Sequence, residues 1–431
     1  MLFRYSSPSR RRRAPGLLFA LTLACAAPAA ATALDGRVVV DWSERAFETL
    51  LAHDGYFDTL AASRALAIVH TAVHDAINAA APRYETYNHV PGDAGADPVA
   101  AAAAAAHETL TALYPAQRAA LDAALERSLA AVADDGARAR GVAVGRAAAA
   151  AMLARRADDG AGRPAEFSLR DEPGAYRHVP GWEILVHPEW RELTPFVLAT
   201  PDELRVAPPP PLSSREYARA FDEVRRFGVA ASEVRSADQT GYAKFWYEFS
   251  DRGWNRIARI VATQERLDLW QAARLFALVN LGMAEGYIAG WDSKLHYDLW
   301  RPVTAIPLAA EDGNPATAPA RDWAPLMPTP PIQDYPSTHS VLGAAAAEAM
   351  IGVLGRDVAF EMTSPTAEDP SKPRRLPGLR AAAEENADSR VMAGIHFRFA
   401  CDAGLELGRS IAQRALASRL RPLEQVAVAG R

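Results

Sequence analysis

Apolar residues recur with the period of an α-helix along most of the chain, and no series of alternating strands accompanies them. Asp97 and Pro98 precede an alanine-rich run, in the manner of an N-cap residue and a proline at the first helical position. This pattern predicts an all-α fold. The other stretches with helical periodicity are residues 43–52, 60–80, 115–133, 137–156, 214–227, 237–250 and 266–291.

Three irregular segments rich in proline, aromatic or polar residues separate these stretches, at 160–211, 305–336 and 364–377. Long loops are uncommon inside compact domains and often carry function. With 431 residues, the chain is long enough for one large core or two packed halves. We expect an N-terminal helical half at 34–265 and a C-terminal helical region at 266–431.

The first 33 residues have the layout of a secretory signal peptide. A basic stretch up to Arg13 is followed by an uncharged apolar run, 17–27, and by small residues at 31–33. The layout predicts export to the periplasm or the extracellular space, by the general or the twin-arginine route. A lipoprotein site at Cys25 is a weaker alternative.

The charge balance of the remaining chain excludes two classes of partner. Five arginines and no acidic residue precede residue 34, which leaves 42 basic against 52 acidic side chains, a balance of −10. An acidic body argues against binding nucleic acid or an anionic membrane surface. No later uncharged apolar run reaches about 18 residues, so we expect no membrane span. Cleavage after Ala33 would leave Cys401 alone, without an internal disulfide.

A first motif places Lys294 and Arg301 seven positions apart, followed by Pro302. On a continuous helix, seven steps return to the same face about two turns along. We therefore expect both side chains to lie on one face and to converge on a single anion. Taken alone, the motif also fits a solvated basic face.

A second motif, Pro-Ser-Thr-His at 336–339, precedes an apolar run that stops at Gly355. We expect a helix to begin at the motif. Free backbone N–H groups and the positive end of the helix dipole favour an oxyanion at such a position. Ser337 would add a hydroxyl donor and His339 an acid or base. A serine N-cap beside an exposed histidine is the alternative.

A third motif begins with Ser389-Arg390 and places His396 six positions after Arg390. On one straight helix, Arg390 and His396 would point about 120° apart. If both serve one site, the backbone must break between them, and Gly394 is the natural position. We expect His396 to open a helix that runs to about residue 420.

Together the motifs supply three cations, helix-end amides, a hydroxyl and two imidazoles. Such a set can hold a tetrahedral oxyanion while a histidine attacks or ligates its central atom. The order of the motifs resembles the signature of the type 2 phosphatidic acid phosphatase and vanadium haloperoxidase superfamily. The layout from about residue 40 is similar to that of exported bacterial vanadium-dependent haloperoxidase-like proteins. The resemblance implies two packed helical bundles, as in vanadium chloroperoxidases.

The resemblance also implies chemistry in the C-terminal region. Vanadate would act there as a Lewis acid, with hydrogen peroxide, a halide and a small organic acceptor as partners. His396 would be the metal ligand, and His339 the general acid or base. The groups that hold the vanadate oxygens would be Lys294, Arg301, Ser337, the backbone N–H of Thr338, and Arg390.

Soluble acid phosphatases of the same superfamily are the alternative. Here no vanadate is needed, a phosphoester is the substrate, His396 is the nucleophile and His339 the general acid. A mature length near 400 and the large helical N-terminal half favour the haloperoxidase branch. The resemblance and the large apolar helical faces also suggest a homodimer.

The chain departs from the family pattern at several positions. The family usually has glycine where this chain has Thr338, and many relatives have aspartate at the position of Ala400, with Asp402 two residues further on. A carboxylate that orients the last histidine is therefore in doubt. Ile332 stands where some relatives have phenylalanine, and Trp291 where some haloperoxidases have an aromatic residue near the halide.

Two other classes of function remain open. His70 and His74 at i, i+4 would present a zinc site on a helix, although a buried or capping role is the stronger interpretation. A non-catalytic helical protein that only binds phosphate or vanadate is the other class. Metal content and turnover would distinguish them.

Overall fold

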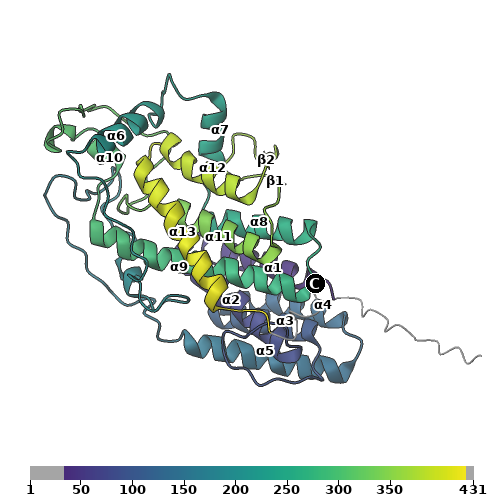
Figure 1. The fold of residues 1–431 in the computed structure, drawn as a ribbon. Helices are drawn as coiled ribbons and strands as arrows, with labels where there is room; N and C mark the ends of the chain where they lie inside the picture. The colour runs from purple at the N-terminus through teal and green to yellow at the C-terminus, as the bar shows by residue number, and fades with distance from the viewer. Residues whose placement is uncertain (1–33, 424–431) are drawn as a thin grey trace, which may run out of the picture. The chain divides into compact units, whose positions relative to one another are not determined.

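Helix α9 (Leu269–Tyr297) runs through the middle of the fold and is buried along almost its full length (Figure 1). The structure is a computed structural model that describes residues 34–423. Helix α2 (Thr59–Ala80) packs on α9 from the N-terminal half, and helix α11 (Thr338–Leu354) packs on it from the C-terminal half. One hydrophobic core therefore extends through both halves.

The N-terminal bundle surrounds α2 with closely packed alanine-rich helices. Asp97 caps its helix as predicted, because its side chain accepts a hydrogen bond from the N–H of Ala100. A Cβ atom at Gly145 would lie 2.4 Å from the carbonyl oxygen of Ala101, so glycine permits the close approach of α3 and α5. The other helices are α1 (Arg37–Asp54), α3 (Pro98–Leu113), α4 (Arg118–Ala130) and α5 (Asp135–Arg155), with the short 3-10 helix η1 (Pro115–Gln117).

The connecting region differs from its predicted helices. The stretch 237–250 contains one whole helix, 237–245, and the first residue of the next, because the chain turns at residues 246–249. This turn presents the carbonyl groups of Trp246 and Glu248 to the C-terminal bundle. The elements are η2 (Pro188–Glu192), α6 (Arg215–Phe227), α7 (Ala237–Phe245) and α8 (Ser250–Gln264).

In the C-terminal bundle, α13 lies directly against α11 at two glycines. A Cβ atom would lie 2.5 Å from the carbonyl oxygen of Ser337 at Gly404, and 2.2 Å from that of Val341 at Gly408. The start of α11 is thereby fixed against α13. The remaining elements are α10 (Pro302–Ala305), η3 (Ala309–Glu311), α12 (Leu379–Met392) and α13 (Arg398–Ser418).

The predicted all-α class and the two packed helical bundles are confirmed. One element that the sequence did not predict is a short antiparallel hairpin, β1 (Phe360–Met362) and β2 (Arg374–Leu376), which pairs Phe360 with Leu376. The described residues form one compact unit, and the boundary between 265 and 266 stays a prediction.

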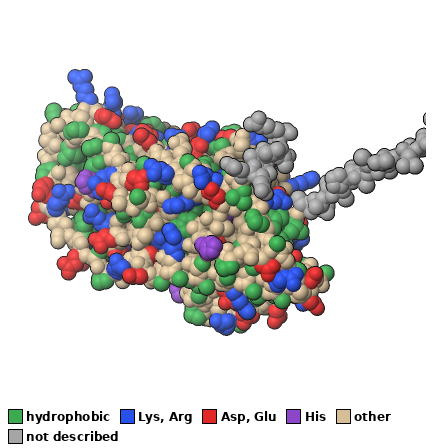
Figure 2. Space-filling model, turned by 60° about the horizontal axis from the view of Figure 1, so that its bottom comes forward, with side chains coloured by type: hydrophobic (Ala, Val, Ile, Leu, Met, Phe, Trp, Pro, Cys, Tyr) green, Lys and Arg blue, Asp and Glu red, His purple; other side chains and the backbone are tan. Residues whose placement is uncertain are grey.

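The surface of the molecule carries charged side chains of both signs. Acidic and basic side chains are intermixed over the face shown in Figure 2. Among residues 34–423, no helix is both long and apolar enough to cross a membrane. Cys401 is a buried free cysteine. The predicted signal peptide, including Cys25, lies outside the described residues.

Candidate active site

Lys294 and Arg301 do not share a helix face, so that prediction is wrong. Helix α9 ends at Tyr297, and Asp298 adopts a left-handed backbone conformation with φ of 50°. Arg301 therefore lies beyond the helix, at the N-cap position of α10. The turn brings it back towards Lys294, and both side chains are fully buried.

Both cations bind one loop, residues 332–334, through its carbonyl oxygens. The Nζ atom of Lys294 donates to the carbonyls of Gln333, at 2.7 Å, and Asp334, at 3.2 Å. The Nε atom of Arg301 donates to the carbonyl of Ile332 at 2.6 Å. This loop leads directly into the second motif, so the first two motifs meet.

Helix α11 begins at the second motif, with Ser337 as its N-cap residue. The Ser337 side chain makes no capping hydrogen bond, and its hydroxyl instead accepts one from Ser340 at 3.1 Å. The hydroxyl of Thr338 is buried and has no hydrogen-bond partner within residues 34–423. Since the first N–H groups of a helix have no intrahelical acceptor, they remain able to bind an anion.

His339 is held in a single tautomer by the turn before α8. Its Nε2 atom lies 3.1 Å from the carbonyl oxygen of Glu248, which can only accept, so Nε2 carries the proton and Nδ1 is free. Burial, followed by the neighbouring Arg390 guanidinium, lowers the pKa of His339 well below its ordinary value. His339 is therefore neutral at neutral pH and able to accept a proton.

The predicted backbone break between Arg390 and His396 is confirmed. Gly394 has φ of 80°, and a Cβ atom there would lie 2.3 Å from the carbonyl oxygen of Gly228. Helix α12 ends at Met392, and α13 begins two residues after His396 rather than at it.

Arg390 is buried with few partners. Its Nη1 atom donates to the carbonyl of Trp246 at 3.3 Å, and its guanidinium carbon lies 5.7 Å from the ring centre of Tyr247. Its Nε–H has no acceptor among the described residues. Burial lowers the pKa of Arg390 to about 10.

His396 lies between a guanidinium and a carboxyl group. Its Nε2 atom is 2.8 Å from Nη1 of Arg301, which also donates to the carbonyl of Ile395. Its Nδ1 atom is 2.9 Å from Oδ1 of Asp334, although the ring is not aligned for a straight hydrogen bond. Burial and the nearby cations lower the pKa of His396 well below its ordinary value.

Asp334 is the site residue that the sequence analysis missed. A carboxylate near His396, which the sequence left in doubt, does not come from α13, where Ala400 is buried and Asp402 is exposed. It comes instead from the loop before the second motif. The sequence does show an acidic residue three positions before Ser337. Its spacing from the third motif, however, gives no indication that it contacts His396.

The pocket has an excess of buried positive charge. Burial, opposed by Arg301 and Lys294, raises the pKa of Asp334 to about 7, and burial lowers the pKa values of Lys294 and Arg301. Burying charge without a partner costs free energy. Two cations beside one carboxyl group, and a third, Arg390, whose Nε–H is unpaired among the described residues, fit an oxyanion such as vanadate or phosphate.

The residues considered for a halide pocket are both buried. Ile332 lies in the loop that binds Arg301, and Trp291 donates from its indole N–H to the carbonyl of Val186 at 3.0 Å. The N–H of Val186 donates to the carbonyl of Pro331. The segment around residue 186 therefore lies beside the loop that leads into the site.

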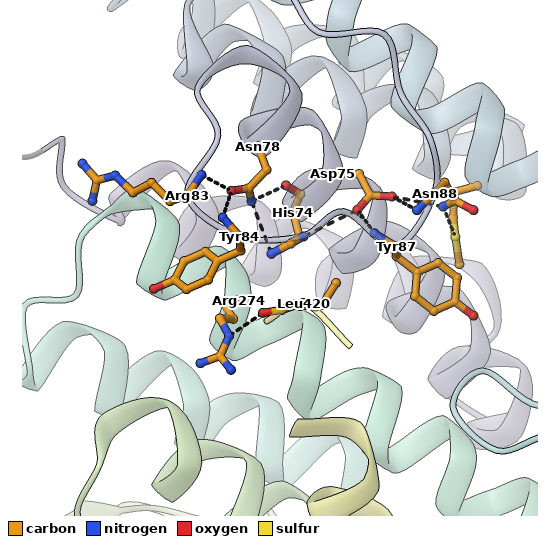
Figure 3. A network of polar contacts seen from close by, with 10 residues as sticks. His74, Asp75, Asn78, Arg83, Tyr84, Tyr87, Asn88, Arg274 and Leu420 are labelled. Atoms are coloured by element: carbon orange, nitrogen blue, oxygen red, sulfur yellow. Dashed lines mark hydrogen bonds and ion pairs between the residues drawn. The ribbon is translucent and has the colours of Figure 1, made fainter. Parts of the chain in front are cut away.

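His70 and His74 make packing and hydrogen-bond contacts inside the N-terminal bundle. His70 stacks on Phe276 with a centroid distance of 5.1 Å, and His74 contacts Asn78 and Asp75 (Figure 3). No cluster of three or more His, Cys, Asp or Glu residues that could hold a metal ion occurs within residues 34–423. The contacts support the interpretation of His74 as part of a buried polar network.

The fold and the pocket define a class: an all-α protein of packed helical bundles with cations and imidazoles buried where helices end. Residues 274–425 match the family model of the VCPO second helical-bundle domain. A vanadium chloroperoxidase from Curvularia inaequalis is 27% identical over 269 residues, which cover 47% of this chain. The match spans 44% of that relative, less than half of its length.

Solved structures share the fold over most of the chain. A bacterial vanadium-dependent iodoperoxidase has a TM-score of 0.77 at 23% identity, covering 90% of this chain and 98% of its own. A holo-type bacterial vanadium-dependent chloroperoxidase has a TM-score of 0.67 at 18% identity, covering 89% and 97%. The chain is thus similar to vanadium haloperoxidases in its fold and in its second helical bundle, as the motifs predicted.

Proposed function

We propose that this protein is a vanadate-dependent haloperoxidase that oxidises halide with hydrogen peroxide and passes the halogen to a small organic acceptor. The observation that carries the proposal is the burial of three cations whose charges act on His396, one of which, Arg301, lies 2.8 Å from its Nε2 atom. Such a pocket favours an oxyanion whose central atom binds an imidazole.

The fit to vanadate rests on the donors of the pocket. Bound vanadate supplies Lewis acidity that activates peroxide for oxygen transfer to halide. His396 offers Nε2 as the ligand atom. The donors to the vanadate oxygens would be the side chains of Lys294, Arg301, Ser337 and Arg390, and the backbone N–H of Thr338.

His339 moves protons in this proposal. Its Nε2–H is engaged by the carbonyl of Glu248, so its free Nδ1 atom is the proton acceptor. Its lowered pKa keeps that atom unprotonated at neutral pH. His339 therefore acts as a general base towards incoming peroxide.

A soluble acid phosphatase is the second candidate, and the contact between Asp334 and His396 favours it. A carboxylate beside Nδ1 raises the electron density at Nε2, which suits a nucleophile that takes up a phosphoryl group. His339 would then act as the general acid. Its depressed pKa argues against that role at neutral pH.

Two assays on one preparation test these functions. Halogenation of a phenol indicator with peroxide and bromide is followed with and without orthovanadate, beside hydrolysis of nitrophenyl phosphate. Vanadate-dependent halogenation that is lost in His396→Ala and kept in His89→Ala, at an exposed site, supports the haloperoxidase. Hydrolysis of nitrophenyl phosphate that vanadate inhibits, without any halogenation, would overturn the haloperoxidase proposal in favour of the phosphatase.

We also propose that the protein is exported to the periplasm or beyond the cell. The basic, apolar and small-residue layout of residues 1–33 supports this. N-terminal sequencing of the secreted protein should begin after Ala33, and an intact N-terminus on a cytoplasmic protein would contradict it. The expected homodimer is tested by sedimentation.

A further inference from the structure

Asp334 is a buried carboxyl group whose backbone is tied down on both sides. Its N–H donates to the carbonyl of Leu299 at 2.9 Å, and its own carbonyl accepts from Lys294. Its side chain is fully buried, and neither carboxyl oxygen has a well-aligned donor among the described residues. Oδ1 lies 2.9 Å from Nδ1 of His396. A buried carboxyl group in this position needs an explanation.

The contacts of His396 determine where its ring proton sits. Arg301 can only donate, so Nε2 of His396 must offer a lone pair to it. In a neutral imidazole the proton is then on Nδ1, facing Oδ1 of Asp334. The guanidinium and the carboxyl group, whose Nη1 and Oδ1 atoms lie 3.8 Å apart, thus favour the same tautomer.

We propose that Asp334 is the positioning residue for His396, replacing the carboxylate that many relatives carry at the position of Ala400. It holds the Nδ1–H tautomer and the ring orientation, and so keeps the Nε2 lone pair directed into the pocket. Its importance rises when an anion is bound, because Arg301 is then drawn to the anion and Asp334 alone holds the ring.

This inference rests on the proposed function, which supplies vanadate as the ligand. It predicts that the affinities for vanadate and for inorganic phosphate respond differently to the loss of Asp334. Vanadate gains affinity from a bond to the histidine, whereas inorganic phosphate is held by charge and hydrogen bonds alone. Loss of Asp334 removes a carboxyl group whose charged form repels anions, which should favour both anions electrostatically. It also frees the ring, which should weaken vanadate alone.

The experiment measures orthovanadate and inorganic phosphate affinities by calorimetry on the full protein. We expect Asp334→Ala to bind vanadate about 10- to 100-fold more weakly, with phosphate binding equal or tighter. Asp334→Asn retains a carbonyl acceptor and should recover most of the vanadate affinity. Asp402→Ala, which removes the exposed carboxylate on α13, is the matched control and should change neither affinity.

Parallel changes in the two affinities of Asp334→Ala, in either direction, would overturn the proposal, as would failure of Asp334→Asn to recover vanadate binding. A second measurement does not depend on vanadate. The two-bond proton–nitrogen spectrum of ¹⁵N-histidine protein, assigned with His396→Gln, should show Nδ1 protonated and Nε2 bare in the anion-free protein. Protonated Nε2 would overturn the inference.

These measurements distinguish a failure of the proposed function from a failure of the role of Asp334. If the wild type fails to bind vanadate, the proposed function fails, and the imidazole spectrum still decides the tautomer. If vanadate binds and the spectrum shows the opposite tautomer, only the role of Asp334 fails.

Discussion

Arg390 differs from the other two cations of the pocket in having its positive charge least satisfied by the protein. Backbone carbonyls hold Lys294 and Arg301 at 2.6–2.8 Å, whereas Arg390 has one long contact and an unpaired Nε–H. An unpaired buried donor gains the most from a ligand acceptor. Arg390 is therefore the cation whose contribution to anion binding should be the easiest to isolate.

Replacement of Arg390 by methionine should weaken phosphate binding by about tenfold to a hundredfold, since charged hydrogen bonds contribute roughly 1.5–3 kcal/mol. Titration calorimetry measures the effect. Arg380→Met is the control, because Arg380 is an exposed residue paired with Glu348. Equal affinities of wild type and Arg390→Met would show that the anion does not reach this guanidinium.

At the residue scale, the sequence predicted which basic and imidazole side chains the structure brings together, and their roles stay predictions. Spacing within a motif was enough because each motif is local. Asp334 was missed because its contact with His396 spans 62 positions and depends on how a proline-rich loop folds. No local pattern encodes such a contact.

At the element scale, the position of Ser337 depends on the packing of α13 against α11. The Gly404 Cα lies so close to the Ser337 carbonyl that any side chain would force the helices apart. Lengthening this contact moves the N-terminus of α11 away from His396, because His396 precedes α13 directly. A packing change there should therefore alter binding as well as stability.

Gly404→Ala should lower the free energy of unfolding by about 1–3 kcal/mol through overpacking and should weaken vanadate binding. Gly241→Ala is the matched control, since nothing lies within 4 Å of its Cβ position in α7. It should stabilise the protein by roughly 0.5–1 kcal/mol. Denaturant unfolding and vanadate titration give both quantities, and unchanged binding in Gly404→Ala would refute the coupling.

The long loop before η2 is held by an ion pair that titrates. His187 contacts Asp58, at 3.3 Å, and Glu189, at 2.8 Å, and the hydrogen bond with Asp58 is the main cause that raises the pKa of His187 to about 9. A raised histidine pKa stabilises the fold below its ordinary value of 6.5 and loses this effect as the pH rises through 9.

The stability difference between wild type and His187→Gln should therefore be largest below pH 6.5 and should vanish towards pH 9 and above. Denaturant unfolding at several pH values measures it. His89→Gln, at an exposed position, should follow the wild-type profile throughout. A constant difference across this range would mean that the ion pair contributes no pH-dependent stability.

Element prediction succeeded where periodicity was long and failed where the chain turns inside a periodic stretch. The end of α9 at Tyr297 and the turn at 246–249 were missed, and both turns deliver groups to the pocket. Residues in a buried turn are apolar like those of the helices beside it, so the apolar pattern does not show where a helix ends.

At the scale of the whole molecule, anion binding should stabilise the fold. Burial depresses the pKa values of Lys294 and Arg301, and the Arg301 guanidinium depresses that of Lys294 further. A bound anion would recover part of this free energy. At 100 times its dissociation constant, a ligand adds about 2.7 kcal/mol. Thermal unfolding with added phosphate should show a rising Tm, with chloride at equal ionic strength as the control. An equal Tm in both salts would contradict the pocket's assignment.

The guanidinium of Arg301 on the imidazole of His396 has a consequence for metal selectivity. Imidazole nitrogens are common ligands of zinc and copper. Here the lone pair of Nε2 is covered by a fixed positive charge, which repels divalent cations and yields only to a ligand that attracts the guanidinium itself. We therefore expect His396 to bind oxyanions in preference to divalent metal ions.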